Sequence, residues 1–146
     1  DVMDLCAERF RNHSVALEVS SLPEISIECR SVQLAQVLTN LLNNAFDALI
    51  LLPRKWVRVG VEASDDVIRI AVTDSGTGIP RHIADKLMLP FFTTKEIGKG
   101  TGLGLSISKG IIEDHGGKFW LDRASVNTKF IIELPRHQKK ENPVAA

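Results

Sequence analysis

A row of short polar side chains is the first feature of this sequence that could do chemistry. Between residues 31 and 51, where apolar spacing predicts a helix, the row consists of Gln36, Asn40, Asn43, Asn44 and Asp47. At about 100° per residue these side chains share one face, which we call the polar stripe. An ordinary solvated face would carry Glu, Lys or Arg, and residues 31–53 contain none of them. Short, rigid oxygen ligands suit Mg²⁺, although the stripe alone is also compatible with a plain polar surface.

A second candidate is the acid that ends a predicted strand over residues 67–73. Ile68, Ile70 and Val72 point to one face of that strand, and Asp74 continues the same register. A buried carboxylate needs hydrogen-bond donors. The exocyclic amine of adenine is such a donor, whereas guanine offers a carbonyl oxygen there, so Asp74 could both bind and select the base. A tight turn with a capping aspartate is the alternative.

Alternating glycines form the third candidate. They stand at positions 98, 100, 102 and 104, immediately before a predicted helix over residues 103–115. Exposed N–H groups at a helix start, together with the helix dipole, favour phosphate binding. The spacing is neither that of a Walker loop nor that of a dinucleotide fingerprint. A glycine hinge is the alternative, and both readings can hold for a mobile lid over a nucleotide.

The elements that must position these residues follow from periodicity and turn signals. Helices are predicted over residues 1–13, 31–51 and 103–115, with a short one near 83–87; strands are predicted over 15–20, 25–28, 56–63, 67–73, 119–122 and 129–134. The core face of the second helix is predicted to hold Leu34, Val37, Leu38, Leu41, Leu42, Ala45, Ala48 and Leu49. We expect an α/β sandwich (α+β) with a mixed, mostly antiparallel sheet of about five strands and three helices on one face. Residues 1–135 form the domain, and residues 136–146 form a flexible polar tail.

Composition narrows the possible partners. The 146 residues include 18 Lys plus Arg and 18 Asp plus Glu, a balance that gives no electrostatic footprint for nucleic acid. No apolar run approaches the roughly 20 residues that span a bilayer, and no signal peptide opens the chain. Cys6 and Cys29 lack metal-ligand spacing and are interpreted as reduced thiols. We therefore expect a cytoplasmic domain without direct membrane contact.

The three candidates occur in order, with Pro90–Lys95 between the second and the third, and this set closely resembles the catalytic and ATP-binding domain of sensor histidine kinases. That domain has the Bergerat ATP-binding fold of the GHKL superfamily, which includes gyrase, Hsp90 and MutL. The segments that resemble the family's N box, first glycine box, F box and second glycine box are Asn40–Ala48, Asp74–Gly78, Pro90–Lys95 and Gly98–Ser106. The resemblance extends from about residue 1 to residue 135.

The resemblance implies a role for each matching residue. Asn44 should coordinate the Mg²⁺ that bridges the phosphates, and Asp74 should accept a hydrogen bond from adenine, with Thr128 supporting it. Residues 81–101 should form the ATP lid. The full set of implied ATP-binding residues is Asn40, Asn44, Asp47, Asp74, Gly76, Gly78, Ile79, Lys95, Lys99, Gly100, Thr101, Gly102, Leu103, Gly104, Leu105 and Thr128.

Two positions depart from patterns common in the superfamily. Hydrolysing members typically carry a glutamate where this chain has Asn40, and an amide cannot act as a general base near neutral pH. We therefore expect slow ATP hydrolysis at best. Many related kinases carry a lysine where this chain has Asp47. The loss of that cation increases the expected importance of Lys95 and Lys99.

The implied function is to bind Mg²⁺-ATP and present its γ-phosphate to a histidine on a separate dimerisation domain, within two-component signal transduction. None of the four histidines precedes an acidic residue, as the family's acceptor usually does. The chain should therefore be one half of a protein-histidine kinase, inactive as an autokinase alone and monomeric. Its partners would be the dimerisation domain and, indirectly, a response regulator; the whole protein could be a membrane-anchored sensor. The alternatives are an anti-sigma-factor type serine kinase and a binding module with a degenerate ATP site.

Overall fold

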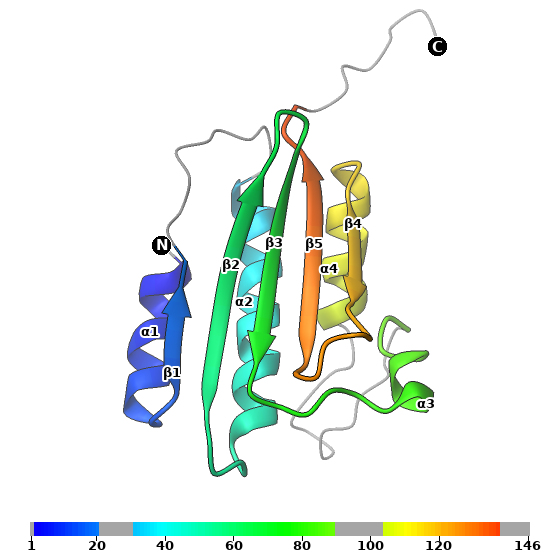
Figure 1. Ribbon diagram of the computed structural model, residues 1–146. Coiled ribbons are helices and arrows are strands. Elements are labelled where there is room, and N and C mark those ends of the chain that lie inside the picture. The colour runs from blue at the N-terminus through cyan, green and yellow to red at the C-terminus, as the bar shows by residue number, and fades with distance from the viewer. Residues whose placement is uncertain (1, 21–30, 90–103, 138–146) are drawn as a thin grey trace, which may run out of the picture.

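Five strands form one sheet in the order β1-β2-β3-β5-β4 (Figure 1). The computed structural model describes residues 2–20, 31–89 and 104–137. The strands are β1 (Ala16–Val19), β2 (Trp56–Ala63), β3 (Val67–Asp74), β4 (Lys118–Leu121) and β5 (Lys129–Pro135). The β1–β2 pair is parallel, and the other three pairs are antiparallel.

The helices are α1 (Val2–Asn12), α2 (Ser31–Leu49), α3 (Arg81–Ala84) and α4 (Gly104–Asp114). Figure 1 shows α1, α2 and α4 on one side of the sheet, and the short α3 beyond the end of β3. The predicted fold class, a mostly antiparallel sheet with three helices on one face, is therefore confirmed. The predicted strand over residues 25–28 lies outside the described residues.

Helix α2 forms the centre of the core, because its apolar side packs against the sheet. Most of the predicted core face is buried or half-buried, and the fully buried members are Val37, Leu41, Leu42 and Leu49. Two positions correct the prediction. Ala48 is exposed; it lies in the last turn of α2, which ends at Leu49. Phe46, which the prediction omitted, is only 4% exposed.

Strand β3 shows the alternation that the sequence predicts. Ile68, Ile70 and Val72 are buried on the helix-covered face, and Asp74 is buried with them at 5% exposure. The strand lies between β2 and β5, with Val57 opposite Asp74 and Phe130 opposite Val72. The sheet thus fixes the acid at the end of an apolar row.

The connection from α4 to β4 is a pair of glycines with different requirements. Gly116 has φ +75°, a conformation that L side chains rarely adopt, and it ends the helix as the sequence predicts. At Gly117 an added Cβ would collide with the backbone carbonyl of Glu133 and would lie 2.9 Å from the Leu134 side chain. Backbone packs directly on backbone at this point, so β4 can pair with β5 only if residue 117 is glycine.

Among the described residues, no helix combines the length and the apolar character that crossing a membrane requires.

Candidate functional site

The site is built around the Asp74 carboxylate at the end of β3. Its Oδ1 accepts a hydrogen bond of 2.7 Å from the backbone N–H of Gly76. Burial raises the pKa of Asp74 to about 6, and the Gly76 hydrogen bond acts in the opposite direction. At neutral pH the protein therefore holds a buried, mostly ionised acid. A ligand that donates hydrogen bonds to this acid would offset part of the cost of burying it.

The loop that follows Asp74 depends on two glycines. An added Cβ at Gly76 would lie 2.7 Å from Asp74 Oδ1 and 3.1 Å from Thr128 Oγ1, so the loop wraps too closely round the acid for any side chain. Gly78 has φ +93°, in the region that favours glycine. Glycine at each of these two positions thus has its own physical reason.

Thr128, the residue immediately before β5, holds the loop from a second side. The backbone N–H of Asp74 donates to Thr128 O at 2.9 Å, and the Thr128 N–H donates to Gly76 O at 3.2 Å. The Thr128 hydroxyl accepts from the Gly78 N–H at 3.2 Å. Asn127 Nδ2 donates to Gly76 O at 3.1 Å, a contact that sequence reasoning missed. Its only signal was adjacency to Thr128.

Ser75 ties the same loop to β2 on the opposite side. Its hydroxyl donates to Arg54 O at 2.8 Å and accepts from the Trp56 N–H at 3.1 Å. The Ser75 N–H donates to Trp56 O at 3.0 Å. Hydrogen bonds from the start of β2 and from the residues just before β2 and β5 therefore hold the loop, which pre-organises the surroundings of the acid.

Replacing Thr128 with valine should loosen this loop without changing its shape. Valine keeps the branched side chain but leaves the Gly78 N–H without its acceptor, at a cost of about 1 kcal/mol in unfolding free energy. Urea unfolding and hydrogen exchange of the Gly78 amide would measure the effect. Thr128→Ser, which keeps the hydroxyl, should preserve the protection of that amide. Equal protection in the valine and serine variants would contradict this role.

Asn40 links α2 to the start of α4. Its Nδ2 donates to Gly104 O at 3.3 Å and to the fully buried Ser108 Oγ at 3.2 Å. Gly104 packs close to this amide, with an added Cβ 3.9 Å from Asn40 Cγ. The polar stripe and the first turn of α4 are therefore adjacent, although 64 residues separate Asn40 from Gly104.

The C-terminal part of the polar stripe, which contains Asn43 and Asp47, faces α1. Arg9 Nη1 donates to Asn43 Oδ1 at 2.8 Å, and Arg9 Nη2 lies 3.9 Å from Asp47 Oδ1. Asn44 is half-buried, and its side chain lies between the directions of Asn40 and Ala48 on the helix. Within the stripe, Asn40 thus contacts α4, whereas Asn43 and Asp47 contact α1.

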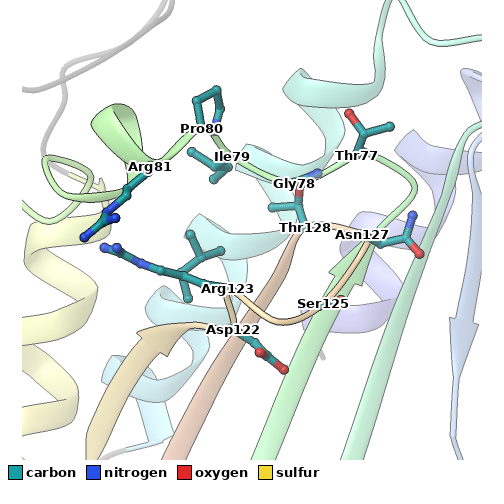
Figure 2. A pocket seen from close by; sticks show the side chains of 11 residues that line it. Thr77, Gly78, Ile79, Pro80, Arg81, Asp122, Arg123, Ser125, Asn127 and Thr128 are labelled. Atoms are coloured by element: carbon teal, nitrogen blue, oxygen red, sulfur yellow. The ribbon is translucent and has the colours of Figure 1, made fainter.

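A cavity of about 500 Å³ adjoins the loop (Figure 2). Thr77–Arg81 form one wall. The other wall comes from the end of β4 and the β4–β5 connection, and its residues are Leu121, Asp122, Arg123, Ser125, Asn127 and Thr128. The cavity shares Gly78, Ile79 and Thr128 with the predicted site, but Asp74 and the polar stripe are not among its lining residues. Its volume is in the range of small-molecule sites, and it lies beside the acid rather than over it.

The remaining predicted site residues fall into two groups. Gly104 and Leu105 begin α4 and are half-buried. Outside the described residues lie the F box, residues 90–95, and six predicted ATP-binding residues, which are Lys95, Lys99, Gly100, Thr101, Gly102 and Leu103. The structure therefore brings Asn40 into contact with Gly104. The loop from Asp74 to Ile79 follows the end of β3 and is held by separate contacts.

A buried acid on a glycine loop beside an asparagine-bearing helix, all at one end of a helix-backed sheet, is the arrangement of a GHKL-type nucleotide-binding domain. Comparison with known proteins specifies the family. Residues 29–138 match the family of histidine kinase-, DNA gyrase B- and HSP90-like ATPases, and the chain belongs to it.

The similar proteins are sensor kinases of two-component systems. Sensor protein FixL of Bradyrhizobium diazoefficiens is 42% identical over 106 residues, covering 71% of this chain and 21% of FixL. The catalytic domain of histidine kinase ThkA matches with TM-score 0.78 and 35% identity over 93% of this chain and 90% of that domain.

Two complexes are also similar to this chain. ThkA was solved in complex with the response regulator protein TrrA (TM-score 0.74, 32% identity, 92% of this chain and 38% of that one). Full-length ShkA in complex with AMPPNP matches with TM-score 0.76 and 25% identity over 94% of this chain and 29% of ShkA. The chain spans about a fifth of the length of FixL, so it corresponds to the ATPase domain of such kinases.

Proposed function

We propose that this chain binds Mg²⁺-ATP and presents its γ-phosphate for transfer to a histidine on a separate dimerisation domain. The observation that carries the proposal is the buried carboxylate of Asp74, fixed by Gly76 and braced through Thr128. The adenine amine would donate to this acid, and the backbone of Gly78 and Ile79 would lie against the ring. The complex of ShkA with AMPPNP, an ATP analogue, supports this assignment by similarity.

The polar stripe fits a magnesium ion held mainly by phosphates and water. Among the described residues no group of three His, Cys, Asp or Glu side chains could enclose a metal. Mg²⁺ usually keeps several waters and takes one or two protein ligands, so the amide oxygen of Asn44 suffices. The ion would neutralise phosphate charge, while the chain's own residues orient the nucleotide along α2.

The Asn40 amide supports transfer rather than hydrolysis. Its Nδ2 is committed to Gly104 O and Ser108 Oγ, and an amide cannot take a proton from water near neutral pH. We infer that bound ATP persists until an acceptor side chain arrives. Catalysis would then consist mostly of positioning and charge neutralisation.

The proposal includes partners that lie outside this chain. The acceptor histidine would stand on the dimerisation domain of the full-length kinase, and the phosphoryl group would pass on to a response regulator in the cytoplasm. The complex of ThkA with TrrA supports such a partner by similarity. We expect the isolated domain to be monomeric and inactive as an autokinase.

Titration calorimetry and a transfer assay test the proposal together. The domain should bind Mg²⁺-ATP and Mg²⁺-ADP and should bind Mg²⁺-GTP much more weakly, because guanine presents a carbonyl oxygen to Asp74. Mixed with its acceptor hairpin and labelled ATP, the domain should place acid-labile, base-stable phosphate on a histidine. Absence of binding at millimolar ATP, or acid-stable phosphate on serine, would overturn the proposal.

A further inference from the structure

We propose that Arg9, on helix α1, contacts the polyphosphate of the bound nucleotide and supplies the positive charge that helix α2 lacks. This inference rests on the proposed function, since it places a phosphate chain along the polar stripe. It concerns a residue far from every sequence motif of the site, and one that only the tertiary structure brings to the stripe.

The position of the Arg9 guanidinium carries the inference. It donates from Nη1 to Asn43 Oδ1 at 2.8 Å, and its Nη2 lies 3.9 Å from Asp47 Oδ1. Its Cζ lies 4.0 Å from the centre of the Phe46 ring. Asn43 and Asp47 are one helical turn apart on α2, so the guanidinium lies along the stripe that carries Asn40 and Asn44.

The support beneath Arg9 is rigid. The Phe46 ring is buried, stacks on Phe10 with centroids 5.5 Å apart, and meets the edge of the His13 ring at 5.1 Å. His13 Nδ1 lies 2.9 Å from Arg9 O, within hydrogen-bond distance. Because Phe10 and Phe46 are both core residues, the backbone that carries Arg9 is fixed relative to α2. A cation held in this way needs little reordering when it meets a ligand.

The charge of the polar stripe explains why bound phosphate would need a cation such as Arg9. Helix α2 contains no basic residue, and Asp47 adds a negative charge to the stripe. A triphosphate beside Asn44 would be repelled by that carboxylate unless a nearby cation compensates for it. Among the described residues, Arg9 is a cation that lies against this part of the stripe, and its side chain is 46% exposed.

The guanidinium also has the right donors. It offers five N–H groups in a planar fork that matches phosphate oxygens, and the contacts with Asn43 and Asp47 do not use all of them. An exposed ion pair such as that of Arg9 with Asp47 contributes little to stability on its own. A clamp between α1 and α2 is therefore a weak explanation for the arrangement, and a ligand-binding role accounts for both the charge and the exposure.

Affinities for a series of ligands with increasing numbers of phosphates test the inference. Calorimetry with adenosine, AMP, Mg²⁺-ADP and Mg²⁺-ATP would compare the parent with Arg9→Gln and with Arg11→Gln, an exposed arginine on the same helix. We expect Arg9→Gln to weaken Mg²⁺-ATP binding about 10- to 30-fold, with smaller losses for ligands with fewer phosphates and less than a twofold change for adenosine. Arg11→Gln should stay within twofold for all four ligands.

Two further variants keep the test decisive if Arg9→Gln folds poorly. Arg9→Lys should lose an intermediate part of the affinity, because it keeps the charge but not the fork. Asp47→Asn should bind Mg²⁺-ATP more tightly than the parent, because it removes the repulsion and leaves Arg9 in place. A uniform loss across all four ligands, or no loss at all, would overturn the role of Arg9. Failure of the parent itself to bind ATP would instead overturn the proposed function.

Discussion

Replacing Asp74 with asparagine should make the nucleotide-free domain more stable while removing most of its affinity for adenine nucleotides. The two effects have one origin, the burial of a carboxylate at the end of an apolar row. The folded protein carries the cost of that burial at all times and recovers part of it only when a ligand donates to the acid.

The stability effect depends on pH with a definite sign. The pKa of Asp74 rises from 3.8 to about 6 on folding, so between these values the folded state binds more protons than the unfolded state. The contribution of this group is therefore unfavourable, growing as pH rises from about 4 to about 6 and fully present above that. A rise of this size corresponds to about 3 kcal/mol. Asp74→Asn should remove this component of the pH dependence.

Urea unfolding at pH 4.5 and pH 7.5 would measure the difference between parent and variant. At about pH 7.5 the unfolding free energy of the variant should exceed that of the parent by about 1–2 kcal/mol. This gain is smaller than the full titration cost, because the Nδ2 of the new amide has no acceptor to donate to. At about pH 4.5 the gain should be smaller still. Asp65→Asn, an exposed change in the β2–β3 turn, should leave both values near those of the parent. A lower unfolding free energy for Asp74→Asn at pH 7.5 would show that the acid is not a net cost to the fold.

The binding effect follows from the Gly76 N–H. It fixes the oxygen that it donates to, so an asparagine at residue 74 would turn its Oδ1 toward Gly76 and its Nδ2 toward the base. An amide donor would then face the adenine amine, which is also a donor. We expect a loss of about 30- to 100-fold in affinity for Mg²⁺-ATP, equivalent to about 2–3 kcal/mol. Calorimetry would measure it, and parent-like affinity in the variant would refute this account of base recognition.

Gly117→Ala should destabilise the domain by about 2–4 kcal/mol. The new methyl would collide with the carbonyl of Glu133 and press on the side chains of Leu134 and Ile112, at 2.9 and 3.0 Å. The collision is with backbone in the β4–β5 pair, so it can be relieved only by moving β4 away from β5. Thermal and urea unfolding would measure the loss.

Gly110→Ala is the matched control, because the same chemical change meets a different environment. Gly110 lies in the interior of α4, and nothing lies within 4 Å of an added Cβ. Alanine there should raise the unfolding free energy by about 0.5–1 kcal/mol through its better helix propensity. If both variants lost stability to a similar degree, the close approach at Gly117 would not be the cause of its effect.

Local patterns predicted much of the fold and part of the site. The strand alternation ending at Asp74 predicted its burial, because a period of two places every second residue on one face. The apolar period of α2 predicted most of its buried face but misplaced Ala48, since periodicity alone does not show which positions in the last turn of a helix have neighbours to pack against.

Contacts between distant segments could not be predicted in this way. Neither Arg9 with Asn43, 34 residues apart, nor Asn127 with Gly76, 51 residues apart, leaves a periodic signal in the sequence. Each depends on which elements the sheet order makes neighbours, above all the parallel pairing that sets β1 beside β2 and brings α1 to α2. Asn127, which supports the loop, and Arg9, which adds positive charge beside the polar stripe, were thus the hardest residues to find from the sequence.

The hydrogen bonds from Asn40 to Gly104 and Ser108 constrain how such a domain could acquire a hydrolytic activity. An Asn40→Glu change would introduce a proton acceptor, but it would also replace a donor with an acceptor opposite the Gly104 carbonyl and set a carboxylate against a fully buried hydroxyl. The Gly104 carbonyl, in the first turn of α4, would lose the hydrogen bond that it accepts from α2. A general base at this position would therefore require compensating changes on α4 as well. A change from phosphoryl transfer to ATP hydrolysis would then need several mutations rather than one.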